Sequence, residues 1–238
     1  MRPLTLVIPA YNEERRIART LDRYLSLPVL SQLIVVCDGG DRTAEIAKKK
    51  FGGRADVLEY GKRLGKGGAL IEGFRRARCE YVGFVDADGA VSTRDFLSAL
   101  DALASDPEIW MVICTRKKRG FFSLRHVASG GFVMLANLLF GLGVDDSQCG
   151  AKIMRRKALM EIMPMLSAKD WVFDVDLIFN MKKRWKVAEA QVDYEYSPDG
   201  KLNPLTSGPG MLVSLFHLRM RSLHCFQKSR RRPRPGKN

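Results

Sequence analysis

Short apolar runs alternate with stretches of helical periodicity through the first half of the chain. Apolar residues that recur every three to four positions favour a helix, whereas short continuous apolar runs favour a buried strand. Strands are predicted at residues 4–8, 32–37, 57–59, 81–85 and 110–114. Helices are predicted between them at residues 13–25, 43–51, 66–78 and 93–104.

This alternation predicts an α/β fold with a mostly parallel sheet flanked by helices and ligands bound at the carboxyl ends of the strands. The second half is less regular. Its predicted elements are helices at 123–142, 157–163 and 174–184 and a short strand at 152–154. The expected organisation is one domain over residues 1–205, an amphipathic helical segment over 206–228 and a disordered basic tail over 229–238, which holds no apolar residue to bury beyond proline.

Composition agrees with one sizeable domain, because 46% of the 238 residues are hydrophobic. The net charge of +14 is unevenly placed, since no acidic residue follows Asp199 while nine lysines and arginines do. A basic arm of this kind binds anionic surfaces, either nucleic acid or acidic lipid headgroups.

The sequence predicts no transmembrane helix, because the longest apolar stretch, residues 132–144, is shorter than the roughly 20 residues that a spanning helix needs. No signal peptide is recognisable, and the five cysteines are widely spaced without a paired motif. A reducing, cytoplasmic location is therefore expected.

Asp86 and Asp88 carry the most informative chemistry of the chain. They follow the apolar run Tyr81–Val85, and Gly89 directly after them supplies a turn. Two carboxylates that converge at a strand end form a hard oxygen site suited to Mg²⁺ or Mn²⁺ carrying a diphosphate. The alternative is a strand end with two solvated aspartates.

Polar residues also follow the other predicted strands. Tyr11 and Glu13 after the first strand are able to stack on a base and bond a ribose, although acids at a helix start also favour the helix dipole. Asp38 follows the second strand beside two glycines. Lys66, in a glycine-rich helix start, suits a phosphate at a helix N-terminus, without the spacing of a P-loop.

Taken in order, the segments Pro-Ala-Tyr-Asn-Glu-Glu, Asp-Gly-Gly-Asp-Arg-Thr, Gly-Lys-Gly-Gly-Ala and Asp-Ala-Asp-Gly resemble the inverting family-2 glycosyltransferases of GT-A fold, which bind a nucleotide sugar and a divalent metal. Over about residues 4–205 the chain is similar to the polyprenyl-phosphate group of that family. Its Gln-Cys-Gly and Trp-x-Phe-Asp-x-Asp-Leu segments most resemble the dolichyl-phosphate β-glucosyltransferase branch, which uses UDP-glucose. The neighbouring mannose synthase branch uses GDP-mannose.

The resemblance implies roles for the residues that match the family's motifs. Implied contacts to the donor come from Pro9, Tyr11, Glu13, Asp38, Lys66, Asp86, Ala87, Asp88 and Lys201, with Asp86 and Asp88 also holding the metal. Implied contacts to the dolichyl or polyprenyl phosphate acceptor come from Arg116, Arg125, Ser129 and Gln148. The residues expected to act in catalysis are Asp88, Arg116, Arg125 and Asp174. Asp174 is the candidate for contacting a sugar hydroxyl, and the alternative is a solvated acid at a helix start.

Two positions depart from the family's pattern. Cys37 stands where the second-strand loop commonly begins with an aspartate, which weakens the assignment of base recognition. Ala90 stands where the mannose synthases often place a metal-binding glutamine, which argues against the mannose branch and leaves fewer protein ligands for the metal.

Peripheral attachment to the cytoplasmic face of an anionic membrane is expected from three features. Residues 116–119 are all cationic and precede Phe121 and Phe122, and the segments 132–144 and 211–221 offer apolar helical faces. A solvated charged surface and an ordinary core helix are the alternatives.

Three other classes of function are less well supported. Nucleic-acid binding is not expected, because carboxylates gathered at strand ends would repel a phosphate backbone and no nucleic-acid-binding motif is present. A family-2 enzyme acting on a soluble, non-lipid acceptor is a nearer alternative. A catalytically inactive nucleotide-sugar binder is disfavoured, since Asp86, Asp88, Arg116, Arg125 and Lys201 are all present.

Overall fold

The computed structural model describes the backbone of residues 2–117, 124–194 and 204–230, and the side chains of residues 2–117, 131–194 and 210–223. Its strands are β1 (Leu4–Ala10), β2 (Leu30–Cys37), β3 (Asp56–Glu59), β4 (Tyr81–Val85), β5 (Ile109–Arg116), β6 (Ala151–Arg155) and β7 (Lys186–Val192). Its helices are α1 (Ile17–Leu25), α2 (Thr43–Phe51), α3 (Gly65–Phe74), α4 (Thr93–Ser105), α5 (Leu124–Phe140), α6 (Arg156–Ile162), α7 (Phe173–Lys182) and α8 (Pro204–Arg230), with a 3-10 turn at Met163–Met165.

The strands form one sheet in the order β3-β2-β1-β4-β6-β5-β7. Every neighbouring pair is parallel except those of β6, which runs antiparallel to both β4 and β5. The start of β6 therefore lies beside the end of β4, with Ala151 opposite Val85. The loop that precedes β6 is brought to the edge of the sheet where the parallel strands end.

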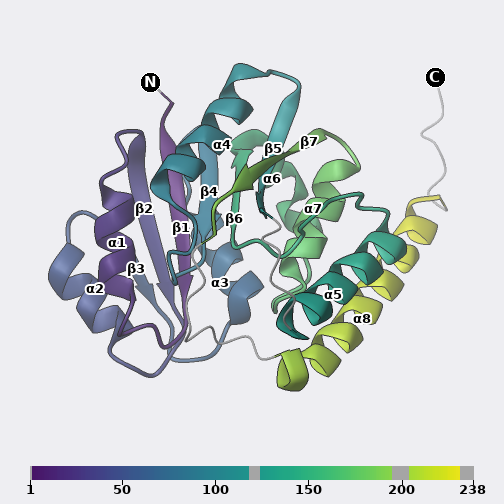
Figure 1. Cartoon of the computed structure of the whole chain (residues 1–238), viewed down its shortest axis with the longest axis horizontal. Helices are drawn as coiled ribbons and strands as arrows, with labels where there is room; N and C mark the ends of the chain where they lie inside the picture. The colour runs from purple at the N-terminus through teal and green to yellow at the C-terminus, as the bar shows by residue number, and fades with distance from the viewer. Residues whose placement is uncertain (1, 118–123, 195–203, 231–238) are drawn as a thin grey trace, which may run out of the picture.

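Helices cover both faces of the sheet (Figure 1). Apolar side chains of α1, α2 and α4 form one buried cluster against the sheet, and those of α3, α5, α6, α7 and α8 belong to a second. The central strands are apolar on both sides, and all five residues of β4 are buried, as expected for strands covered on both faces. Helices α5 and α8 pack side by side at one end of the molecule (Figure 1).

The predicted α/β class and mostly parallel sheet are confirmed, and each predicted strand and helix of the first half is present within a few residues of its expected ends. Strand β7 was missed, because its sequence Lys-Val-Ala-Glu-Ala-Gln-Val mixes charged residues and alanines with few β-branched ones. It is the edge strand beside β5, where an exposed face tolerates charge.

The expected segment boundaries at residues 205 and 228 lie within the single helix α8. Its backbone continues through residues 229 and 230, and the rest of the expected basic tail lies outside the described residues. Met211, Leu215 and Leu218 of α8 are buried in the core. Part of the 206–228 segment thus also contributes to packing.

Candidate active site

The loop that carries the two aspartates is fixed by helix α1. The Thr20 hydroxyl donates to the Ala87 carbonyl at 2.8 Å, and Arg23 Nη1 donates to the Gly89 carbonyl at 2.7 Å. Gly89 has a φ of 65°, a backbone conformation that residues with a side chain rarely adopt. The turn predicted after the strand is therefore present, and it leaves Asp86 and Asp88 at the carboxyl end of β4.

Asp86 is held from two sides. Its Oδ1 lies 3.0 Å from Lys66 Nζ, and its backbone N–H donates to the Gly150 carbonyl at 2.8 Å. Gly150 packs so closely that a Cβ there would lie 2.5 Å from the Asp86 carboxyl carbon. Burial raises the pKa of Asp86 to about 6, opposed by Lys66 and reinforced by Asp88.

Asp86 and Asp88 both line a small hollow at the carboxyl end of β4, and Asp88 has a different set of partners. Its Oδ1 accepts the Ala90 N–H at 3.1 Å. Burial raises the pKa of Asp88, while the Ala90 bond and the charge of Arg16 oppose the shift. Tyr194 lines the hollow together with both aspartates, and burial beside those two carboxylates raises the pKa of its hydroxyl.

The residues expected to hold a nucleoside gather where β1 and β2 end. Pro9 lies in β1 beside β2, and Tyr11 follows, partly exposed, with the Arg63 guanidinium stacked 3.2 Å from its ring centroid. Glu13 is largely buried and is paired with Arg16 at 2.7 Å. Asp38 is buried as well. These side chains share one edge of the sheet with Asp86 and Asp88, as the order of the strands predicted.

Asp38 and the start of α3 are joined by hydrogen bonds. Asp38 Oδ2 accepts the N–H groups of Leu64 and Gly65 at 2.8 and 2.9 Å, and the Gly68 N–H donates to the Lys169 carbonyl. The backbone N–H groups at the start of α3 therefore already have acceptors within the protein, and the Lys66 ammonium group is paired with the carboxylates of Asp86 and Asp174. A phosphate contact from this helix start stays a prediction.

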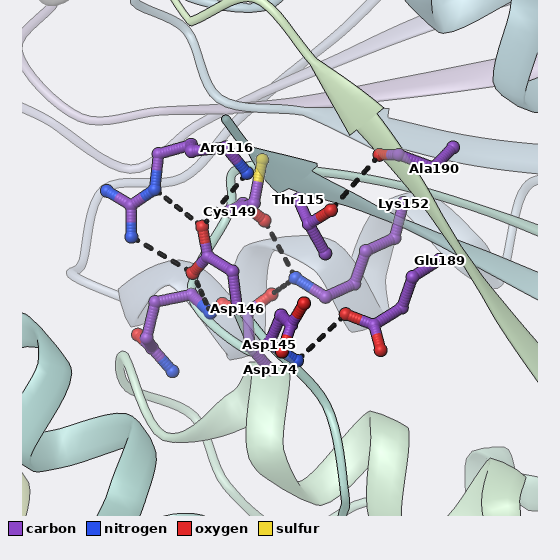
Figure 2. A network of polar contacts seen from close by, with 10 residues as sticks. Thr115, Arg116, Asp145, Asp146, Cys149, Lys152, Asp174, Glu189 and Ala190 are labelled. Atoms are coloured by element: carbon purple, nitrogen blue, oxygen red, sulfur yellow. Dashed lines mark hydrogen bonds and ion pairs between the residues drawn. The ribbon is translucent and has the colours of Figure 1, made fainter. Parts of the chain in front are cut away.

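Arg116, at the end of β5, forms a two-pronged ion pair with Asp146, shown in Figure 2. Its Nε and Nη2 donate to the two carboxylate oxygens at 2.6 and 2.9 Å. The same carboxylate accepts the backbone N–H of Gln148 at 3.1 Å, and the guanidinium lies 5.4 Å from the Tyr194 ring centroid. Burial alone would lower the pKa of the Arg116 guanidinium, but the hydrogen bonds and the charge of Asp146 raise that pKa above its ordinary value. Arg116 is therefore a fixed cation close to the hollow.

Asp174, on α7, is fully buried between two lysines. Lys152 Nζ lies 2.5 Å from its Oδ1, and Lys66 Nζ lies 2.9 Å from its Oδ2. Burial alone would raise the pKa of Asp174, but Lys152 and then Lys66 lower it. Oδ1 accepts a hydrogen bond from Lys152, whereas Oδ2 is ion-paired with Lys66 and has no hydrogen-bond partner among the described residues. Both oxygens thus face ammonium groups at a fully buried position, which does not suit the expected contact with a sugar hydroxyl.

Three expected acceptor or donor residues cannot be placed. The backbone of Arg125 and Ser129 lies in α5, but their side chains are outside the described residues, and so is all of Lys201. The aromatic pair Phe121 and Phe122 is outside them too. Their implied roles stay predictions.

The residues present fit a divalent metal held together with a diphosphate. In the described part of the chain, no group of three or more His, Cys, Asp or Glu side chains could hold a metal ion by itself. Asp86 and Asp88 supply hard carboxylate oxygens, which Mg²⁺ and Mn²⁺ prefer, and Mg²⁺ is usually bound by one or two carboxylates plus substrate phosphates and water.

Sequence reasoning gave no role to Asp146, Lys152 or Tyr194. Lys152 could have been found from the sequence, because it lies between apolar residues in a predicted strand. A lysine buried at such a position needs a carboxylate partner. Asp146 and Tyr194 lie in irregular segments and meet Arg116 only after the chain has folded, so no local sequence pattern marks them.

A sheet of this topology, with an Asp-x-Asp loop at the end of β4, is the arrangement of the GT-A glycosyltransferases. The chain belongs to Glycosyl transferase family 2, whose family profile matches residues 5–163. It is 29% identical to the dolichyl-phosphate β-glucosyltransferase of Dictyostelium discoideum over 92% of this chain and 75% of that protein. It is 30% identical to the human dolichyl-phosphate β-glucosyltransferase over 93% of this chain and 76% of that protein.

Solved structures of similar fold include glucosyl-3-phosphoglycerate synthase from Mycobacterium tuberculosis. Its complex with uridine diphosphate aligns with a TM-score of 0.72 and 20% identity, covering 92% of this chain and 80% of that one. Its complex with Mn²⁺, UDP-glucose and phosphoglyceric acid aligns with a TM-score of 0.69 and 21% identity, covering 92% and 80%. At this identity the likeness establishes the GT-A fold.

Proposed function

We propose that this enzyme transfers glucose from UDP-glucose to dolichyl or polyprenyl phosphate, with inversion at the anomeric carbon. The observation that carries the proposal is that Asp86 and Asp88 line one hollow with Tyr194, whose ring centroid lies 5.4 Å from the clamped Arg116 guanidinium. It is supported by the relatives named for this reaction, which align over most of their length.

The donor occupies the edge formed by the ends of β1, β2 and β4. Tyr11, Glu13 and Asp38 contact the nucleoside, and Asp86 and Asp88 hold a divalent metal, Mg²⁺ or Mn²⁺, on the diphosphate. When bound, such a metal neutralises charge on the leaving nucleoside diphosphate. The synthase of similar fold was crystallised with Mn²⁺ and UDP-glucose, which supports this choice.

The acceptor is a phosphate monoester that is already anionic near neutral pH. It therefore needs no strong general base of the kind that a hydroxyl acceptor requires. Catalysis rests on positioning and on charge stabilisation instead. Arg116 aligns the acceptor phosphate, together with Arg125 and Ser129, which lie one helical turn apart on α5.

Transfer of radiolabelled sugar to dolichyl phosphate in detergent tests the proposal. UDP-glucose and GDP-mannose are supplied in parallel with Mg²⁺ or Mn²⁺, and EDTA serves as the control. Lipid-linked label from UDP-glucose that disappears with EDTA is the expected result. Label from GDP-mannose alone would correct the donor, and transfer only to a short water-soluble phosphate or hydroxyl acceptor would refute the lipid acceptor.

We further propose that α5 and α8 rest on the cytoplasmic face of an anionic membrane. No helix in the described ranges is both long and apolar enough to cross a bilayer. On α5, Met134 and Leu138 are 74% and 77% exposed, and α8 exposes further apolar side chains next to it. Those of α8 are Leu212, Val213, Phe216, Met220 and Leu223. Arginines of α8 lie among them, so the surface combines apolar and cationic groups.

Replacing Leu212, Phe216 and Met220 together by serine is expected to lower binding to anionic vesicles at least about 10-fold, since each large apolar side chain contributes roughly 1.5–3 kcal/mol when buried. Co-sedimentation with vesicles measures this binding. The three positions are exposed, so the melting temperature should change little.

The matched control is Met165→Ser, which removes an exposed methionine outside both helices. It should bind vesicles as the unmodified protein does. Equal vesicle binding by the triple variant and the control would refute the assignment of this surface.

A further inference from the structure

A chain of alternating charges leads from strand β6 to the carboxylate proposed to bind the metal. Lys152 Nζ pairs with Asp174 Oδ1, Asp174 Oδ2 pairs with Lys66 Nζ, and Lys66 Nζ pairs with Asp86 Oδ1, over distances of 2.5, 2.9 and 3.0 Å. Lys152 also donates to the Cys149 carbonyl at 2.8 Å, and Figure 2 shows this end of the chain. The four side chains sum to zero net charge.

These charges lie in an apolar environment. The side chains of Lys152 and Asp174 are fully buried, and that of Lys66 is 6% exposed. Both ammonium groups lie within 5.5 Å of the Phe84 ring centroid. Removing one partner of such a set leaves an unpaired buried charge, which is strongly destabilising. Each member therefore has a fixed place relative to its neighbours.

The glycines on either side of Lys66 explain how its ammonium group comes close to Asp174. A Cβ at Gly67 would lie 2.5 Å from the Ala168 carbonyl oxygen and 2.7 Å from Phe173 Cβ, and one at Gly65 would overlap the Lys169 carbonyl. The first turn of α3 thus packs directly onto the segment that leads into α7. That close approach brings Lys66 within reach of Asp174.

We propose that Lys66, Asp174 and Lys152 are positioning residues that hold Asp86 in the orientation that binds the metal and diphosphate. The inference rests on the proposed function in taking Asp86 as a metal ligand. Lys66 fixes one oxygen of Asp86, and the backbone of Gly150 packs against the other. Asp174 acts through Lys66, without touching the sugar.

Binding of Mn²⁺ in the presence of UDP, followed by electron paramagnetic resonance, tests the proposal without the acceptor. Lys66→Met leaves Lys152 and Asp174 as a neutral buried pair and removes the partner of Asp86, whose side chain is 26% exposed and so stays in contact with water. The fold is therefore expected to persist, with a lower melting temperature. Positioning predicts Mn²⁺–UDP affinity at least about 10-fold weaker, a loss of about 1.4 kcal/mol. Tighter Mn²⁺ binding would mean that Lys66 merely competes with the metal, and would overturn the proposal.

The double variant Lys152→Met/Asp174→Asn removes an ion pair and keeps the charge balance. If Asp174 only neutralised Lys152, the double variant would regain normal Mn²⁺–UDP affinity. Positioning predicts that affinity stays at least about 10-fold weaker while the melting temperature recovers relative to Asp174→Asn alone, because like-charged lysines are no longer left together.

A third comparison separates positioning from sugar contact. Positioning predicts the same loss of affinity for UDP and UDP-glucose in the Asp174 variants, whereas a sugar contact predicts a loss for UDP-glucose alone. Lys50→Met, which breaks an exposed ion pair with Asp22, is the control and should bind normally. If the unmodified protein binds no Mn²⁺–UDP, the proposed function itself fails. If the unmodified protein binds Mn²⁺–UDP and the variants bind it equally well, only the proposed positioning role of Lys66, Asp174 and Lys152 fails.

Discussion

Asp88→Asn is expected to abolish metal-dependent transfer while the protein stays folded. Asparagine keeps a side-chain oxygen that can accept the Ala90 N–H, which Asp88 bonds at 3.1 Å, so the loop conformation is preserved. The negative charge that would bind the metal is lost. Because removing one group that stabilises developing charge commonly lowers kcat about 100-fold or more, we expect at least that loss.

Transfer of labelled glucose to dolichyl phosphate measures this effect, and thermal unfolding reports on the fold. Asp101→Asn is the matched control, since Asp101 is an exposed carboxylate on α4 that pairs with Arg2. The control should keep full activity. Full, EDTA-sensitive transfer by the Asp88 variant would show that this carboxylate is not a metal ligand.

Gly150→Ala is expected to displace the Asp86 carboxylate. A Cβ at this position would lie 2.5 Å from the carboxyl carbon and 3.0 Å from Asp86 Cβ, so the aspartate must move. Asp86 is also held by Lys66, which leaves it little room. Overpacking in such a site costs about 1–3 kcal/mol of stability. We expect transfer to fall about 100-fold, as for a misplaced catalytic group.

Gly61→Ala is the matched control, because a Cβ at Gly61 would meet nothing within 4 Å. Its activity and melting temperature should match those of the unmodified protein. For Gly150→Ala, Mn²⁺–UDP affinity should fall together with the rate of transfer. An alanine variant with unchanged Mn²⁺ affinity would show that the contact between Gly150 and Asp86 does not shape the metal site.

The sequence was most informative where local pattern decides structure. The apolar run Tyr81–Val85 is a buried strand with the predicted ends, and the helix predicted at Thr43–Phe51 is also present with its predicted ends. Because parallel strands end at one edge of the sheet, Asp38 and Asp86 could be placed near each other before any contact was known.

The sequence was least informative where partners come from distant segments. Asp174 was expected to meet the sugar, and the structure buries it between Lys66 and Lys152, which lie 108 and 22 residues away in the sequence. Nor did the sequence predict that Asp146, from the loop before β6, would pair with Arg116. No local pattern encodes such pairs, because the chain must first fold for them to meet.

By itself, the sequence determined the fold class, the family and the chemistry at the strand ends, because hydrophobic periodicity and short glycine and aspartate motifs are local properties. The tertiary structure alone decided which charges are paired. The antiparallel insertion of β6 brings Gly150 against Asp86 and Lys152 against Asp174. Burial then fixes the partners, since a charge removed from water must find an opposite charge within reach.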